Sequence, residues 1–289
     1  MIPLLLSLRP TQWTKNFFVF AGLIFSLEFF QVAALIKAID AFIIFCAISS
    51  AMYLINDVKD LAADQKHPIK KARPIASGRV PVTLAIYFAA LLLLVSIPLS
   101  FYLNLSFGWV IVAYVTLMLG YSFFLKNMVI LDVFSIAAGF VLRAIAGVVV
   151  IKVALSPWLV ICTILLALFI ALGKRRHELM TIDLATEHRK ILEEYNPRLL
   201  DQMISAVAGS TVMAYALYTL WPETIAKFGT TSLVYSVPFV LYGIFRYLYL
   251  IYKKEEGGRP EKTLLTDLPL LSDILLWIVA LIIIIYCRL

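Results

Sequence analysis

Cysteine and histidine are scarce in this sequence, with three of each among 289 residues. Cys46, Cys162 and Cys287 all lie inside apolar runs and show no paired spacing. They indicate small buried side chains rather than a disulfide framework or a metal-binding cluster. The histidines form no HExxH pattern, so a zinc site has no support. The sequence also lacks a basic n-region with a small-residue cleavage site, and we therefore expect the first apolar segment to remain in the mature protein.

Charged residues are few as well. They make up 15% of the chain, whereas 62% is hydrophobic, and the mean hydropathy is +0.94. Soluble domains are typically about 45–50% apolar, so this composition predicts an integral membrane protein. The formal net charge of +7 comes from basic residues dispersed among the loops between apolar runs, which disfavours nucleic acid as a partner.

The apolar runs have the length that a helix needs to cross a bilayer, about 17–23 residues. They predict an all-α polytopic membrane protein with nine transmembrane helices around a cytoplasm-facing cavity, and with residues 1–289 as one domain. The expected spans are 17–34, 38–57, 82–103, 107–125, 129–151, 155–173, 203–221, 232–252 and 271–288.

The positions of lysine and arginine predict the orientation of the chain. If the N-terminus is cytoplasmic, 19 of these residues lie on cytoplasmic segments and four on outer segments. Under the positive-inside rule this asymmetry predicts a multi-pass protein of the cell (inner or plasma) membrane with its N-terminus in the cytoplasm and its C-terminus outside. Two cytoplasmic loops, about 58–81 and 174–202, are longer than the others.

The first long loop follows an acidic stretch that runs from Asn56 to Asp64. In a helix, Asp57, Asp60 and Asp64 are spaced i, i+3 and i+7, so their carboxylates share one face, and Asn56 lies one turn from Asp60. Like charges on one face repel each other unless a cation lies between them. Because Mg²⁺ binds carboxylates together with substrate phosphates, the stretch predicts a Mg²⁺-diphosphate site at the membrane surface. The alternative is a solvated helix end in a cytoplasmic loop.

Basic residues that could bind phosphate lie on the same side of the membrane. They are Arg9, Lys15, Lys66, Lys71, Arg73, Lys126, Lys174 and Arg175, and Tyr121, in the same stretch as Lys126, is a further candidate for substrate binding. Guanidinium and ammonium groups suit phosphate oxygens. For each lysine or arginine taken alone, the alternative is a charge that only sets topology.

Arg143 lies within a predicted span. It follows Asp132 by eleven residues, about three helical turns, so both project to one side. An arginine at membrane depth is costly unless it faces a cavity or a partner, which makes Arg143 a candidate for substrate binding. The alternative is an ion pair with a buried carboxylate. Gly139 and Gly147, one turn on either side, permit close approach of another helix.

The string Asn56-Asp57-x-x-Asp60-x-x-x-Asp64, after two apolar spans in a nine-span chain, resembles the first acidic motif of the UbiA superfamily of intramembrane transferases. The resemblance implies Mg²⁺-diphosphate binding at this motif. Most members transfer a prenyl group from an allylic diphosphate to an aromatic or lipid acceptor, and they carry a second acidic motif after the sixth span. Here that loop opens with the basic run Gly173-Lys174-Arg175-Arg176-His177.

One family within this superfamily resembles residues 8 to 180 more closely, namely decaprenyl-phosphate phosphoribosyltransferase. The shared motifs are Leu8-Arg9-Pro10-x-Gln12-Trp13-x-Lys15-Asn16, Tyr53-Leu54-x-Asn56-Asp57, Arg73-Pro74-Ile75-Ala76-x-Gly78, Tyr121-Ser122-x-x-Leu125-Lys126 and Gly139-Phe140-x-x-Arg143-Ala144. The resemblance implies an enzyme that transfers phosphoribose from 5-phosphoribosyl diphosphate (PRPP) to a polyprenyl phosphate and releases diphosphate, for use in cell wall biogenesis.

This chemistry assigns roles to the candidate residues. Asp57, Asp60 and Asp64 would hold Mg²⁺ on the leaving diphosphate, and Asn56 would orient it. Lys66, Lys71 or Arg73 would clamp phosphate oxygens. The remaining cations would serve the 5-phosphate and the lipid phosphate, in a division that the sequence leaves open, as it does the oligomeric state, a homo-oligomer included.

Two other functions compete with this one. An ordinary UbiA-type prenyltransferase is favoured by the first acidic motif alone. A transporter or channel for a phosphorylated metabolite is suggested by Arg143 and Arg246, the two arginines inside predicted spans. The acidic stretch opposes that third interpretation, because its carboxylates would repel an anion in the absence of a metal.

Overall fold

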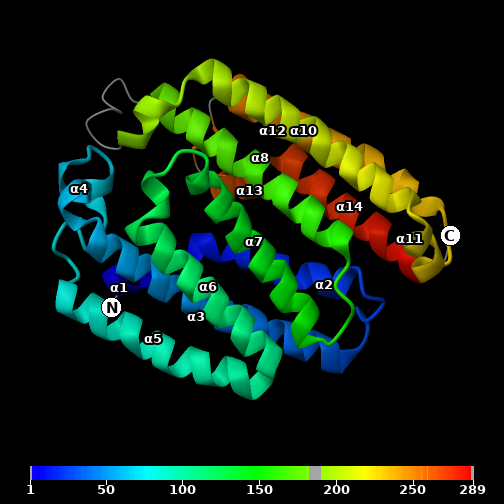
Figure 1. Ribbon diagram of the computed structural model, residues 1–289, viewed down its shortest axis with the longest axis horizontal. Helices are drawn as coiled ribbons and strands as arrows, with labels where there is room; N and C mark the ends of the chain where they lie inside the picture. The colour runs from blue at the N-terminus through cyan, green and yellow to red at the C-terminus, as the bar shows by residue number, and fades with distance from the viewer. Residues whose placement is uncertain (1, 182–189, 255, 259, 288–289) are drawn as a thin grey trace.

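The computed structural model describes residues 2–181, 190–254, 256–258 and 260–287, and every regular element within these ranges is helical (Figure 1). Eight helices are long and apolar enough to cross a membrane within this part of the chain. Their bounds are α3 (Val32–Lys59), α5 (Val82–Leu103), α6 (Leu105–Phe123), α7 (Leu131–Val150), α8 (Pro157–Thr181), α10 (Pro197–Leu220), α12 (Val237–Tyr252, preceded by the 3₁₀ turn η5, Ser232–Ser236) and α14 (Leu268–Cys287).

Short helices connect the long ones. They are α1 (Ile2–Ser7), η1 (Pro10–Phe20), α2 (Ala21–Ile24), α4 (Leu61–Lys66), η2 (Lys70–Ala72), η3 (Leu125–Asn127), η4 (Lys190–Glu194), α11 (Pro222–Phe228) and α13 (Pro260–Thr266). The predicted all-helical polytopic fold is confirmed, and five of the eight helices begin and end within a few residues of a predicted span. Helices α3 and α10 each begin six residues before the predicted start, and α8 continues eight residues beyond its predicted end. Within the second long loop, residues 182–189 lie outside the described ranges.

Helix α7 lies at the centre of the bundle (Figure 1). It packs against α6 on one side and α8 on the other, and it contributes residues to both large apolar clusters. Ala146 and Val150 belong to the cluster shared with α3, α5 and α6, whereas Val133 and Phe140 belong to the cluster shared with α8, α10 and α12. The rest of the bundle is therefore arranged around α7.

The structure differs from the prediction of nine long helices at the first predicted span, 17–34. Residues 10–20 form the 3₁₀ helix η1, residues 21–24 form α2, and α3 begins at Val32. An eleven-residue 3₁₀ helix is unusually long, and at about 2.0 Å per residue it extends roughly 22 Å. In Figure 1, η1 and α2 run lengthwise through the bundle, and α3 then runs back in the opposite sense along the same axis. A ninth segment is thus present, but it is a narrow rod rather than a long α-helix.

The segment formed by η1 and α2 packs closely against α7, which suits a 3₁₀ helix because it is thinner than an α-helix. A Cβ atom placed on Gly147 would lie 1.8 Å from the carbonyl oxygen of Val19, and one on Gly22 would lie 2.8 Å from the amide nitrogen of Val148. Backbone therefore meets backbone where η1 and α2 cross α7. The predicted role of Gly147 in close helix approach is confirmed, with a 3₁₀ helix as the partner.

Candidate active site

The acidic stretch spans the end of one helix and the start of the next. Helix α3 ends at Lys59, Asp60 has non-helical dihedral angles (φ −91°, ψ 5°), and α4 begins at Leu61. The backbone bonds from the Asp60 amide to the Asn56 carbonyl (2.9 Å) and from the Asp64 amide to the Asp60 carbonyl (2.8 Å) keep the chain coiled across this break. The prediction of one uninterrupted helical face was therefore wrong at Asp60, although the coil continues beyond it.

Asp57 and Asp64 converge on a single arginine. Nη1 of Arg73 donates to Asp64 Oδ2 at 2.6 Å and to Asp57 Oδ1 at 3.2 Å, and Arg9 also donates to Asp57 Oδ1. Both carboxylates are buried, whereas the two guanidinium groups are about one quarter exposed. Arg9 also stacks over the ring of Tyr53 at 4.9 Å. The first long loop thus folds back, so that Arg73 contacts the acidic stretch that precedes the loop in the sequence.

Asp60 faces a different partner. Lys126, on η3 after α6, donates to Asp60 Oδ1, and Asn56 Nδ2 donates to Asp60 Oδ2 at 3.1 Å. The ion pair joins the end of α3 to the loop between α6 and α7, two segments that are far apart in the sequence. Of the eight predicted cations, Arg9, Arg73 and Lys126 therefore contact the acidic stretch directly.

A second group of polar residues lies further along η1. The charge of Lys15 is influenced by Glu261 on α13, by Arg143 and by Arg9, and Lys174 is within electrostatic range of Lys15 and Glu261. Tyr121 lies within range of Lys174 as well. The predicted residues Lys15, Tyr121 and Lys174 therefore lie within electrostatic range of one another or of a shared partner, and Glu261 joins them from α13, in the connection between α12 and α14.

Burial lowers the pKa of Lys15 to about 8, even though the nearby carboxylate of Glu261 acts in the opposite direction. Arg143 and Arg9 reinforce the lowering because they are like charges. An anion bound beside this lysine stabilises its charged form and offsets the cost of burying the charge. Lys15 therefore suits a phosphate-binding role.

Arg143 is held by uncharged acceptors on three elements. Its Nε donates to Asn16 Oδ1 at 2.8 Å, its Nη2 donates to Tyr114 Oη at 2.7 Å, and its Nη1 donates to the Gly139 carbonyl at 2.8 Å. The side chain is 4% exposed. Neither predicted alternative describes this arrangement, because the partners are neutral rather than a carboxylate, and every guanidinium nitrogen already has a protein acceptor. Arg143 joins η1, α6 and α7.

We expect Arg143→Met to destabilise the protein by about 3 kcal/mol, since it removes three buried hydrogen bonds to a charged group. The KM for a phosphate-bearing substrate should stay within about twofold in the fraction that folds. Thermal unfolding in detergent and steady-state kinetics measure the two effects. A KM increase of tenfold or more without a loss of stability would return Arg143 to the substrate-binding set.

Arg175 also has a structural environment. It is 3% exposed and donates to Asp132 on α7 and to Glu178 at 2.5 Å, while Tyr195 donates to the other oxygen of Asp132 at 2.9 Å. Two carboxylates therefore already neutralise this guanidinium. Arg175 therefore links α8 to α7 through Asp132, and its role in phosphate binding stays a prediction.

Two predicted cations remain outside the group. The side chains of Lys66 and Lys71 are exposed at the surface of the first loop. Arg246, the second intramembrane arginine, forms a two-point ion pair with Asp267 at 2.7 and 3.0 Å. With Arg143 and Arg246 both paired inside the protein, the transporter interpretation loses the two residues that suggested it.

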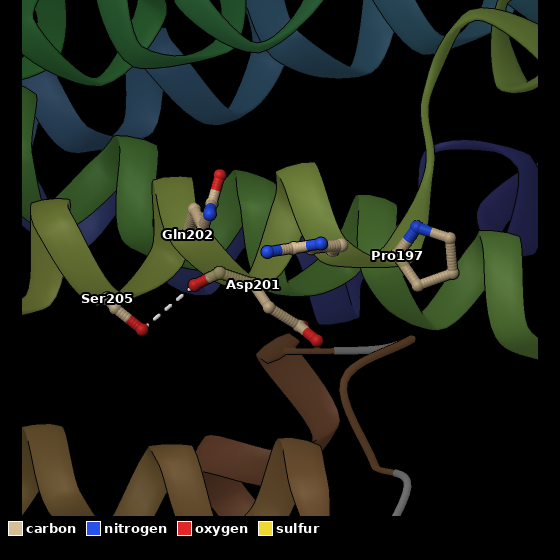
Figure 2. Close-up of a pocket in the computed structure, with 5 residues that line it drawn as sticks. Pro197, Asp201, Gln202 and Ser205 are labelled. Atoms are coloured by element: carbon tan, nitrogen blue, oxygen red, sulfur yellow. Dashed lines mark hydrogen bonds between the residues drawn. The ribbon is translucent and has the colours of Figure 1, made fainter.

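The groove drawn in Figure 2 lies away from these clusters. It is lined by Pro197, Arg198, Asp201, Gln202 and Ser205 at the start of α10, and the Ser205 hydroxyl donates to the Asp201 carbonyl at 2.8 Å. The groove contains none of the predicted site residues, so its walls play no part in the proposed chemistry.

We assigned no site role from the sequence to the connection between α12 and α14. In the structure, however, Gln12 on η1 donates to Glu261 Oε1 across 249 positions of sequence. The loop also lies against α8, where a Cβ atom on Gly257 would be 3.0 Å from the Gly173 carbonyl oxygen. Gly257 and Gly258 lie in space against Gly173 and His177, at the two ends of the basic run that opens the second long loop. This glycine pair is the sequence feature that could have indicated the contact.

The donor set can be compared with what Mg²⁺ requires. Within the described residues, no three acidic, histidine or cysteine side chains are grouped so as to hold a metal ion. Asp57 and Asp64 converge on Arg73, and Asp60 turns to Lys126. Mg²⁺ typically binds one or two carboxylates and takes its other ligands from phosphates and water. The residues therefore fit a metal that arrives with a diphosphate, but they do not form a three-carboxylate cage.

Comparisons with known proteins identify the family of this chain. The sequence model of the UbiA prenyltransferase family matches residues 16–268. The decaprenyl-phosphate phosphoribosyltransferase of Corynebacterium glutamicum is 35% identical over 97% of this chain and 86% of its own, and that of Mycolicibacterium smegmatis is 34% identical over 95% and 90%. A UbiA homologue from Archaeoglobus fulgidus, solved with GPP and Mg²⁺, shares the fold with a TM-score of 0.73 at 16% identity, over 98% of this chain and 99% of its own. This multi-pass membrane enzyme therefore belongs to the UbiA prenyltransferase family.

Proposed function

We propose that this enzyme transfers the 5-phosphoribosyl group of PRPP to a polyprenyl phosphate and releases diphosphate, with Mg²⁺ as cofactor. The observation that carries the proposal is that carboxylates of the first motif form ion pairs with cationic side chains from other segments. Asp57 pairs with Arg9 and Arg73, and Asp60 pairs with Lys126. The phosphoribosyltransferase relatives, which match 94–97% of the chain, support the choice of substrates.

The paired charges match the ligand in kind. A diphosphate with a divalent cation carries both signs of charge, so it can replace the internal ion pairs without leaving either partner bare. Asp57 and Asp60 would hold the metal, with Asp64, the third predicted ligand, positioned beside them through Arg73. When bound, Mg²⁺ supplies charge neutralisation on the leaving diphosphate. Arg9, Arg73 and Lys126 would then bind phosphate oxygens.

The reaction needs no general base from the protein. An oxygen of the lipid phosphate, already anionic, attacks the anomeric carbon and forms the new C–O bond. The bond from that carbon to the diphosphate oxygen breaks, and the diphosphate leaves with the electron pair. Preorganised cations stabilise the charge that develops in this step. Lys15 and Lys174, which lie within electrostatic range of each other, would bind the remaining phosphate groups.

The arrangement in the membrane is part of the proposal. Residues 1–289 form one transferase domain, with the N-terminus cytoplasmic and the C-terminus outside. The excess of basic residues on the segments that carry the site supports this orientation. The apolar helices would accommodate the polyprenyl chain while its phosphate reaches the cytoplasmic cluster.

Purified protein incubated with Mg²⁺, labelled PRPP and a polyprenyl phosphate should yield labelled lipid and free diphosphate. The competing prenyltransferase function would consume an allylic diphosphate with an aromatic or lipid acceptor instead. Labelled lipid from PRPP supports the proposal. Turnover of the allylic diphosphate without any lipid product from PRPP, across several polyprenyl lengths, would overturn it.

We expect kcat/KM to fall as the pH rises through about 8, because Lys15 loses its proton there and no longer attracts phosphate. Lys15→Arg keeps the positive charge at higher pH, so the variant should not show this decline. A pH profile of kcat/KM from roughly pH 6.5 to 9.5 measures the effect. Lys253→Arg, at an exposed position, is the matched control and should retain the wild-type profile. An unchanged profile in Lys15→Arg would remove Lys15 from the phosphate site.

A further inference from the structure

Three buried side-chain polar atoms have no hydrogen-bond partner within the described residues. One is Nε of Arg175, whose other guanidinium nitrogens are paired with Asp132 and Glu178. The other two are Oε2 of Glu261 and the hydroxyl of Tyr247. An unsatisfied buried polar group costs about 1–3 kcal/mol, and native proteins keep few of them. Such atoms are explained when a ligand supplies the missing hydrogen bonds.

The two orphan atoms occupy one region of the molecule. The Tyr247 hydroxyl is within electrostatic range of Glu261. A Cβ atom placed on Gly173, the residue before Lys174, would lie 3.6 Å from Cε1 of the Tyr247 ring. Glu261 is fixed by Gln12 through its other oxygen and lies beside Lys15. The region is therefore the junction of η1, α8, α12 and α13, next to the lysines assigned to phosphate.

A carboxylate is out of place in a site that binds only phosphate. It repels phosphate oxygens and offers them no proton. Lys15 and Lys174 would each attract an anion more strongly without Glu261. The unpartnered oxygen of this carboxylate suits a part of the substrate that donates hydrogen bonds. Among the proposed substrates the polyprenyl phosphate has no hydroxyl group, whereas the ribose ring has neighbouring hydroxyls.

We propose that Glu261 and Tyr247 recognise the ring hydroxyls of the transferred sugar and so make the enzyme selective for a hydroxylated donor over one without hydroxyls. Glu261 Oε2 accepts from a sugar hydroxyl, and the Tyr247 hydroxyl exchanges a hydrogen bond with the same group or its neighbour. This inference rests on the proposed phosphoribosyl transfer and names the residues that distinguish it from prenyl transfer at the same acidic motif.

The experiment compares kcat/KM for PRPP with that for its 2-deoxy and 3-deoxy analogues. A site built to hydrogen-bond a hydroxyl discriminates against the analogue that lacks it. Wild-type enzyme should prefer PRPP over at least one analogue by about 10- to 100-fold. In Glu261→Gln this preference should fall below about threefold, mainly through loss of activity on PRPP.

Two further variants keep the test decisive. Tyr247→Phe removes only a hydroxyl without a partner in the described protein, so it should fold normally and reduce the preference about three- to tenfold. Glu256→Gln lies in the same loop at an exposed position and should retain the wild-type preference.

The failures of the two proposals can be told apart. Wild-type enzyme that makes no lipid product from PRPP contradicts the proposed function and this inference together. Wild-type enzyme that uses PRPP and its deoxy analogues equally well, or a Glu261→Gln variant with the full preference, overturns this inference alone.

Discussion

Asp57→Asn and Asp60→Asn should each lower turnover at least about a thousandfold while the protein is still made and folded, since each removes a ligand charge from the proposed Mg²⁺-diphosphate site. Asp57 is 3% exposed and forms ion pairs with Arg9 and Arg73, and Asp60 forms an ion pair with Lys126. Asparagine keeps the size of the side chain and one acceptor oxygen, so packing changes little. Product formation at saturating PRPP measures the loss.

Asp40→Asn provides the matched control for these variants. Asp40 is an exposed aspartate at the opposite end of the same helix, α3, so its replacement should leave turnover within about twofold of wild type. The expression level and the elution profile in size-exclusion chromatography report folding. Near wild-type rates in either motif variant, with Mg²⁺ at its usual concentration, would contradict the metal-site proposal.

Gly147→Ala should prevent stable folding, because the new Cβ would lie 1.8 Å from the Val19 carbonyl oxygen and 2.7 Å from its carbon. These are backbone atoms of η1, so the clash cannot be relieved by a side-chain rotation. Overpacking in a core typically costs about 1–3 kcal/mol, and displacement of a backbone segment costs more. We expect a fall in the melting temperature in detergent or a complete loss of monodisperse protein.

Gly209→Ala is the control for this prediction. Gly209 lies on α10, and a Cβ atom there meets nothing within 4 Å. Alanine favours helix over glycine by about 1 kcal/mol, so this variant should be as stable as wild type or slightly more stable. If Gly147→Ala melts at the same temperature as Gly209→Ala, the close crossing of η1 and α7 does not exist in solution.

Much of the fold follows from composition and pattern. Spans were predictable because bilayer thickness demands a run of apolar residues that few other structures need. The first segment was mispredicted because hydropathy measures apolar length and is insensitive to helix type. Its 3₁₀ geometry depends on Gly147 and Gly22, which bring the backbones of two distant segments into contact. No local sequence rule contains that information.

The candidate site was predictable in part. The acidic motif and the nearby cations were recognised by type and spacing, and Arg9, Arg73 and Lys126 do contact it. For Arg143, burial of a charge was visible in the sequence, but its neutral partners, Asn16 and Tyr114, were not. Its role in substrate binding stays a prediction. Glu261 was missed for the opposite reason, since a charge in a polar loop looks ordinary until the loop folds back onto η1.

The contact between Gln12 and Glu261 has a consequence for biosynthesis. The two residues are 249 positions apart, so the ribosome completes the first long before the second. At about 5–20 residues per second, the interval is on the order of 12 to 50 seconds. During that interval the nascent chain already carries the acidic motif but lacks Glu261 and its contact with Gln12. If Glu261 binds the sugar as proposed, the site is complete only once nearly the whole chain has been made.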